Sequence, residues 1–319
     1  MKKVLIIIAV VVLVAGLVIF ASAFIAAGFD FSKIGKAKYE THIYTADTNF
    51  SKIEVHSTVD DITFKPSSDG KCSIECLEED KVTHTVEVEN GTLKIGVKDE
   101  RQWIDLISLF KKTPYITVYL PSDTYESVTA ECITGDILIP RAFSFGNIVI
   151  DGDTGNILCG ASATESITIN STTGSISITG VRSNNMTLKA TTGKITASTV
   201  ECSGDVSVKV TTGDIVLVDF DCNSLKCNGT TGSVILTNVT ATGDFNIEDG
   251  TGTVHFDKCD AANIYVKSTT GNISGSLMTE KDFRAKSSTG KVNVPDTRTG
   301  GICEISSTTG NINITIAES

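Results

Sequence analysis

Residues 167–178 read ITINSTTGSISI, an alternation of apolar and polar residues that is interrupted once, at Thr173-Gly174. Alternation with a period of two is typical of a strand with one buried face, so this stretch predicts two strands joined by a corner. A Thr-Gly pair recurs in register ten times from Thr134-Gly135 to Thr309-Gly310, with glycines 20, 19, 19, 20, 19, 20, 19, 19 and 20 residues apart. A repeat of such constant length predicts a solenoid of about ten stacked coils of 19–20 residues.

The repeats share their apolar positions as well as their length. Counted from each glycine, position +2 is always Ile or Val, positions −5 and −7 are apolar throughout, and position −6 is mostly polar. Identical residues at a fixed phase favour parallel coils stacked about 4.8 Å apart over a meander of antiparallel hairpins. Glycine suits a corner with positive φ. The predicted corner residues are Thr134, Gly135, Thr154, Gly155, Thr173, Gly174, Thr192, Gly193, Thr212, Gly213, Thr231, Gly232, Thr251, Gly252, Thr270, Gly271, Thr289, Gly290, Thr309 and Gly310.

Residues 39–127 are less regular and predict a cap over the first coil, because an uncovered solenoid end exposes unpaired backbone groups. A degenerate coil is expected near Ile53 and Ile62, with Asp60 in the glycine position. Asn90-Gly91 between two alternating runs predicts a hairpin. The apolar spacing within 101–112 predicts a short helix.

The N-terminal segment predicts a membrane anchor. Lys2 and Lys3 precede 24 uncharged residues, 4–27. As a helix these would extend about 36 Å, enough to cross a hydrocarbon layer of about 30 Å. The alternative is a signal peptide cleaved near Ala21-Ser22-Ala23; the apolar run before that site is longer than a usual signal-peptide core and continues past it, which favours the retained anchor. We expect residues 1–3 inside the cell, 4–27 in the membrane, 28–38 as a linker, and the cap (39–127) and solenoid (128–319) outside.

The charge and composition exclude several functions. The net charge of −11 repels nucleic acid, so no nucleic-acid partner is expected. The four histidines are scattered, and the constant coil length leaves no long loops to build a catalytic cleft. No cofactor or metal site is indicated, because Cys-x-x-Cys and the glycine-aspartate nonapeptide of calcium-binding rolls are both missing.

Nine cysteines occur, and most fall in core positions of the repeat, where a thiol is a small buried hydrophobic group. Cys202 and Cys222 differ, because both lie nine residues after their corner glycines in adjacent coils. Their Cα atoms would then be about 4.8 Å apart, within the range of a disulfide. We therefore predict at most one disulfide, between these two residues.

The tandem Thr-Thr-Gly-x-Ile coils, of which Thr172-Thr173-Gly174-Ser175-Ile176 is one, follow an apolar N-terminal segment and an irregular β region. In this the chain resembles the bacterial "putative adhesin" family over roughly residues 45–316. The resemblance implies an all-β, right-handed parallel β-helix in the cell envelope, and it supplies no catalytic residues.

Together these features predict a membrane-anchored, extracytoplasmic solenoid that binds or scaffolds without catalysis. The expected partner is an envelope protein or a surface polysaccharide. Two alternatives remain open: a regulator of envelope-stress signalling, and a carbohydrate-active β-helix enzyme. The last strand, expected at 312–316, has no following coil in the sequence, so we also expect an open edge there that could support self-association.

Overall fold

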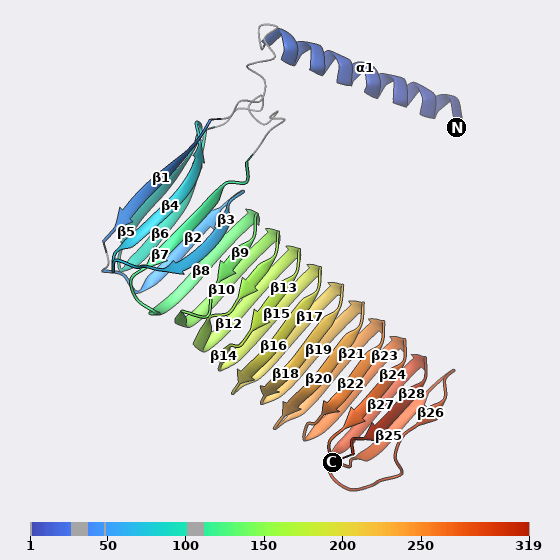
Figure 1. Ribbon diagram of the computed structural model, residues 1–319. Helices are drawn as coiled ribbons and strands as arrows, with labels where there is room; N and C mark the ends of the chain where they lie inside the picture. The colour runs from blue at the N-terminus through green and yellow to red at the C-terminus, as the bar shows by residue number, and fades with distance from the viewer. Residues whose placement is uncertain (1, 27–37, 48, 101–111, 319) are drawn as a thin grey trace.

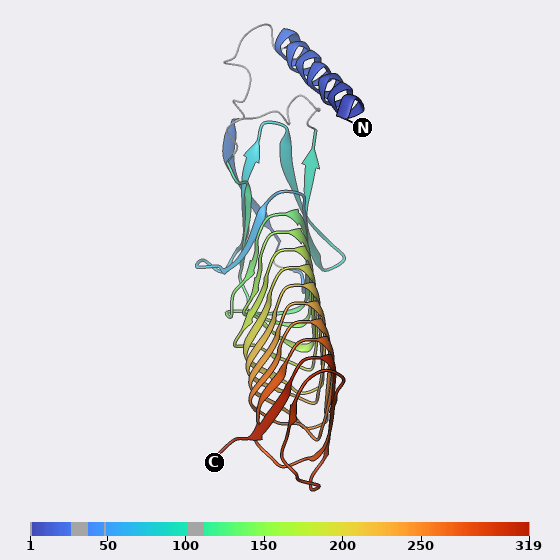
Figure 2. The ribbon, with the colours of Figure 1, turned by 90° about the vertical axis from the view of Figure 1, so that its right-hand side faces the viewer.

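A computed structural model of the chain describes residues 2–26, 38–47, 49–100 and 112–318, and within the N-terminal helix the side chains of residues 11–22 and 25. The described residues form one helix, α1 (Lys2–Ala26), and 28 strands that are hydrogen-bonded into a single sheet wound as a solenoid (Figures 1 and 2). Among them, no helix is both long enough and apolar enough to cross a membrane. The helix expected within 101–112 falls almost wholly outside the described residues.

The repeats fold into parallel coils stacked in register, as the constant spacing predicts. Thr173 pairs with Thr192, which pairs with Thr212, so the corner threonines lie one above another. The strands of these coils are β8 (Thr124–Thr134) and β9 (Ile137–Ile139), β10 (Ser144–Thr154) and β11 (Ile157–Cys159), β12 (Ser162–Thr173), β13 (Ile176–Thr179) and β14 (Arg182–Ser183), β15 (Asn185–Thr192) and β16 (Ile195–Cys202), β17 (Asp205–Thr212) and β18 (Ile215–Cys222), β19 (Ser224–Thr231) and β20 (Val234–Ala241), β21 (Asp244–Thr251) and β22 (Val254–Cys259), and β23 (Asn263–Thr270) and β24 (Ile273–Leu277).

The cap begins with a coil of its own, as the Asp60 position indicates. β2 (Lys52–Ser57) pairs in parallel with β8, and β3 (Asp61–Pro66) pairs in parallel with β9. The remaining strands of the cap are β1 (Tyr39–Ala46), β4 (Cys72–Glu79), β5 (Val82–Glu89), β6 (Thr92–Asp99) and β7 (Tyr115–Leu120). β6 and β7 stack on the far side of this coil, and β5, β4 and β1 close the end in antiparallel pairs. The expected boundary at 127/128 therefore falls inside β8.

Two local predictions are confirmed. β5 and β6 form the hairpin around Asn90-Gly91, where φ is 51° and 75°. The predicted corner glycines have φ between 131° and 158°, except Gly290, which is not among the residues with positive φ. Space restricts these positions as much as φ does: a Cβ on Gly213 would lie 2.1 Å from the carbonyl oxygen of Gly193.

The sequence pattern missed a second corner. Five coils have a residue with φ between 49° and 66° at the sixth position after the corner glycine. The residues are Gly180, Thr199, Asp219, Asn238 and Lys258. The column shares a backbone conformation without sharing a residue type, so it leaves no repeat in the sequence. The left-handed region is costly for a β-branched residue such as Thr199, and the neighbouring coils hold it there.

The order of the last two coils contradicts the expectation of an open edge at 312–316. β27 (Ile302–Thr309) pairs with both β23 and β25 (Asp282–Ser287), and β28 (Ile312–Ile316) pairs with both β24 and β26 (Val292–Asn293). The C-terminal coil is thus inserted beneath the coil that precedes it in sequence, as Figure 1 shows at the red end. The terminal coil of the solenoid consists of β25 and β26.

Candidate functional site

The predicted corner residues have a structural role. The N–H of eight corner glycines among the described residues donates to the carbonyl of the threonine in the next stacked coil, as in the 2.9 Å bond from Gly193 to Thr212, whereas Gly290 N–H donates to Ser287 Oγ at 2.9 Å. The position after the glycine often adds a side-chain cap: the Asp214 carboxylate accepts the N–H of Ser233 at 2.8 Å. These groups hydrogen-bond to one another along the stack, so the corner column has no cluster of free polar groups that could bind a ligand.

The nine cysteines are all buried and free, in agreement with the core interpretation. Glu201 pairs with Asp221, so Cys202 and Cys222, which follow them, lie on neighbouring strands. Burial raises the pKa of Cys202 and raises that of Cys222 to about 12, which keeps both as poorly reactive thiols. The disulfide between them stays a prediction.

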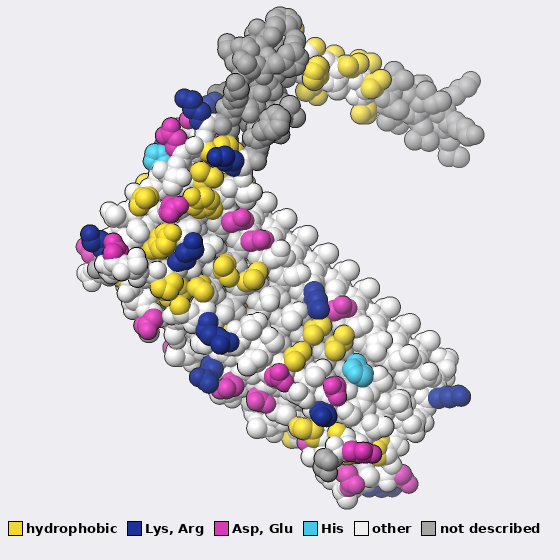
Figure 3. All heavy atoms as spheres, in the orientation of Figure 1, with side chains coloured by type: hydrophobic (Ala, Val, Ile, Leu, Met, Phe, Trp, Pro, Cys, Tyr) yellow, Lys and Arg dark blue, Asp and Glu magenta, His cyan; other side chains and the backbone are white. Residues whose placement is uncertain are grey.

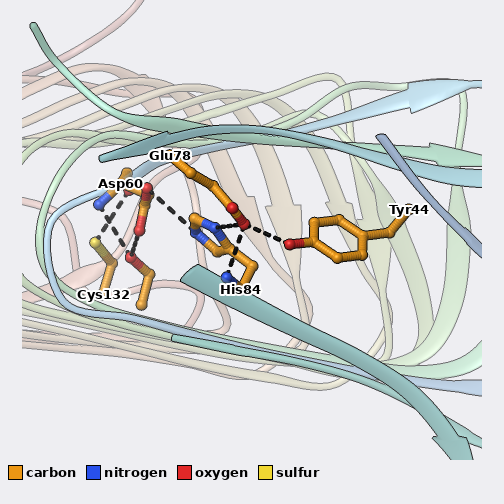
Figure 4. Close-up of polar contacts among 6 residues, drawn as sticks. Tyr44, Asp60, Glu78, His84 and Cys132 are labelled. Atoms are coloured by element: carbon orange, nitrogen blue, oxygen red, sulfur yellow. Dashed lines mark hydrogen bonds and ion pairs between the residues drawn. The ribbon is translucent and has the colours of Figure 1, made fainter. Parts of the chain in front are cut away.

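A buried polar cluster lies where the cap meets the first coil, and sequence reasoning did not find it (Figure 4). His84 is at its centre. Its Nδ1 lies 3.0 Å from Glu78 Oε1, its Nε2 lies 3.4 Å from Asp60 Oδ1, and its backbone N–H donates to Glu78 at 2.8 Å. Tyr44 donates to the same Glu78 oxygen at 2.6 Å, and Ser57 donates to Asp60 Oδ2 at 2.6 Å.

The electrostatics of the cluster favour a buried ion triad. Burial alone would lower the pKa of His84, but Asp60 and Cys76 outweigh it and raise the pKa to about 10. Burial alone would likewise raise the pKa of Glu78, yet the hydrogen bonds from Tyr44 and His84 lower it. An imidazolium therefore lies between two carboxylates.

This cluster ties the antiparallel strands of the cap to the cap's own coil, because its residues come from β1, β4, β5 and the corner between β2 and β3. The side chain of His84 is fully buried and that of Asp60 is 1% exposed, so no substrate can reach the ring. Asp60 in the place of a corner glycine was the one sequence signal that pointed here.

A second buried acid lies within the coils. Asp249 is 3% exposed, and neither of its carboxylate oxygens has a hydrogen-bond partner among the described residues. It occupies the space left by Gly229, where a Cβ would lie 2.5 Å from Asp249 Oδ1. Burial raises its pKa to about 6. The stability of the coils should therefore depend on whether the Asp249 carboxyl group is protonated.

An exposed groove crosses the first coils on the side away from the Thr-Gly corner. It consists of a hollow of about 450 Å³ and a neighbouring one of about 730 Å³, which share Thr124, Ser144 and Thr164. The larger hollow arises where strands of three or four residues, β9, β11 and β13, give way to strands of eight, β16 and β18.

Arg141 runs lengthwise through the larger hollow. A Cβ on Gly180 would lie 1.4 Å from its guanidinium, so the absence of a side chain there makes room for the arginine. Among the described residues, none pairs with the Arg141 guanidinium. Arg182, beside it, is paired with Glu201 at 2.8 Å. The groove thus offers a free planar cation among hydroxyl, amide and carboxylate groups.

The face drawn in Figure 3 carries charges of both signs in mixed order, with apolar side chains mainly toward the cap. Across the part of the chain that the structure describes, no three His, Cys, Asp or Glu side chains are grouped to hold a metal ion.

Comparison with known proteins identifies the family. The sequence profile described as Toastrack DUF4097 matches residues 50–237 and 201–319. The chain belongs to the DUF4097 (Toastrack) family. The resemblance to the adhesin-like family inferred from the repeat is thereby confirmed, and no curated protein matches.

Comparison with solved structures finds matches to this Toastrack chain at low identity. A "putative adhesin" from Parabacteroides distasonis ATCC 8503 is 13% identical with a TM-score of 0.50, and the match covers 88% of this chain and 98% of that one. A "putative adhesin" from Bacteroides fragilis NCTC 9343 is 16% identical with a TM-score of 0.42, covering 88% and 99%. A "putative lipid binding protein" from P. distasonis is 14% identical with a TM-score of 0.45, covering 88% and 98%.

Proposed function

We propose that this Toastrack protein is a non-catalytic binding protein of the bacterial cell envelope, held at the membrane by its N-terminal segment, with the solenoid outside the cytoplasm. The anchor rests on the sequence, in which Lys2 and Lys3 precede 24 uncharged residues. The name "putative adhesin" of the structure that matches with a TM-score of 0.50 is consistent with a binding role at the cell surface.

The groove around Arg141 is the observation that carries the binding role. Exposed polar side chains line it, Thr124, Thr164, Asn184 and Ser203 among them, together with apolar surface that includes the half-buried Phe50 in the smaller hollow. Hydroxyl, amide, carboxylate and guanidinium groups match a polyhydroxylated ligand, so a surface polysaccharide is the favoured partner.

The test is binding of purified envelope polysaccharide to the full chain in detergent micelles. Arg141→Ala should weaken binding about ten- to a hundredfold, because one charge-assisted hydrogen bond is worth about 1.5–3 kcal/mol. Lys209→Ala, an exposed cation on a strand face outside the groove, is the matched control and should leave binding unchanged. Equal binding by Arg141→Ala and the unaltered chain would contradict the groove as the site.

The membrane arrangement has its own test. Alkaline phosphatase fused after Ser319 should be active if the solenoid is exported, and a reporter that works only in the cytoplasm should be inactive at the same position. The opposite pair of results would place the solenoid in the cytoplasm. Extraction of the full chain by alkaline carbonate would argue against the anchor.

A further inference from the structure

The C-terminal coil is held on both of its faces, which is unusual for the end of a chain. On one side Gly271 N–H donates to Thr309 O at 2.8 Å, and Ile273 N–H donates to Asn311 O at 2.9 Å. On the other side Ile312 N–H donates to Lys291 O at 2.8 Å. Residues 302–316 therefore fill a slot between the coil of β23 and β24 and the coil of β25 and β26.

The coil of β25 and β26 is suited to be the terminal one. β26 has only two residues, and Pro295 follows shortly after it. Proline lacks the N–H that a central strand must donate, so a strand extended through Pro295 would be poorly paired inside the stack. The C-terminal coil has no proline and an uninterrupted β28 of five residues, so it fits an interior place.

The C-terminal coil and the coil of β25 and β26 nevertheless have the same column of apolar residues, so either could stack on the coil of β23 and β24. Ile264 faces Cys303 in the structure, and Phe283 occupies the equivalent column of the other coil by pairing with the same Cys303. Synthesis delivers residues 282–293 before residues 302–316. The segment that fills the slot is therefore synthesised after both of the coils between which it inserts.

The connection between the two coils has no strand of its own and can change its path. Residues 294–301 are eight residues and can span up to about 26 Å when extended. Two of its side chains hold it down: Thr297 donates to Lys281 O at 2.8 Å, and Thr299 donates to Glu280 at 2.9 Å. Gly300 supplies the turn, with φ of 78°.

We propose that the slot between β24 and β26 accepts residues 302–316 from a second copy of the chain, so that two solenoids join at their C-terminal ends by exchanging this coil. The partner segment is identical to the one that the slot holds in the monomer, so every contact in the slot is preserved. Only the path of residues 294–301 changes. Such an exchange is the low-cost route to a dimer that a hinged terminal element provides.

Paired cysteines on the exposed strand face test the proposal in the full chain. Ser306 pairs with both Lys267 and Lys286, so the double variant Lys267→Cys/Ser306→Cys should form a disulfide within one chain. The double variant Lys267→Cys/Lys286→Cys should not, because two coil spacings separate these positions by about 10 Å. The reverse result would show coils stacked in sequence order and would overturn the proposal.

The exchange itself is read from two single variants that carry tags of different size. Lys267→Cys and Ser306→Cys chains, unfolded together and refolded at high concentration, should give a disulfide between chains of different size. Lys209→Cys mixed with Ser306→Cys is the matched control and should give none, because Lys209 lies several coils away. If the disulfide forms within one chain but never between chains, the coil does not exchange and the proposal fails.

Discussion

The two ends of the solenoid are closed by different means. At the N-terminal end, antiparallel strands cover the first coil, and a buried imidazolium between two carboxylates ties them to it. At the C-terminal end, the chain instead inserts its last coil beneath the previous one, and Lys281 forms a buried ion pair with Asp260 at 2.7 Å. The first closure depends on a buried ion cluster and the second mainly on backbone pairing. The two ends should therefore respond differently to substitution and to pH.

The largest effect is expected from His84→Ala. The substitution leaves Asp60 and Glu78 buried without their counter-charge, which typically costs about 3–5 kcal/mol. Chemical denaturation of the full chain measures the loss, and hydrogen exchange should place it in β4 and β5. An equal loss of protection at β27 would mean that the two ends are not independent. The conservative control is Tyr44→Phe, which removes one hydrogen bond and should cost about 1 kcal/mol.

A smaller effect is expected in the coils between the two ends. Gly213→Val places a β-branched residue at a φ of 136° and a Cβ 2.1 Å from Gly193 O, so we expect a loss of about 2–4 kcal/mol. The control is Gly70→Ala, where φ is 72° but nothing lies within 4 Å, and it isolates the backbone strain. A thermal melt of Gly213→Val that is unchanged within about a degree would contradict the close contact between corners.

The pH dependence should have the same sign in the two regions but fall in different pH windows. The pKa of Asp249 rises on folding to about 6 from an ordinary value of 3.8, so the folded coils bind the extra proton. Their stability should fall by about 1–3 kcal/mol as pH rises from 4 to 6 and then stay level. The pKa of His84 rises to about 10, so the stabilisation it gives the cap is complete below its unfolded pKa of 6.5 and is lost only as pH rises toward 10.

Asp249→Asn tests this difference, because the amide does not titrate. The variant should abolish the change in coil protection between pH 4 and 6 and leave the cap unchanged. Hydrogen exchange at both pH values, read separately for β21 and β4, makes the measurement. An unaltered pH response in the variant would show that another group is responsible.

The smallest effect is expected at the cysteines, which belong to neither closure. Cys222→Ala removes one buried thiol and should cost about 1 kcal/mol. Thiol labelling of denatured, unreduced protein should find nine free cysteines, or seven if Cys202 and Cys222 are joined. Five or fewer would mean that disulfides brace the core, and the view of these residues as small apolar groups would be wrong.

The sequence predicted the corners and the hairpin but not the residues of the candidate site. The corner glycines and the Asn90-Gly91 hairpin follow from local rules, since each needs a backbone conformation that its residues favour. The groove was not predicted, because it depends on how soon each coil turns after its corner. Arg141 gave no signal, as its significance rests on Gly180, two coils away.

The sequence by itself determined the repeat: parallel coils, their number and register, the buried columns and the Thr-Gly corner. Periodic local interactions repeat without long-range information, so one coil specifies the next. Only the tertiary structure decided how the ends are closed. His84 meets Asp60 and Glu78 through strand pairing over long separations, and the coil order at the C-terminus depends on which of two similar coils is better paired inside the stack. Columns of equal spacing cannot distinguish those orders, because both satisfy the same pattern of apolar side chains.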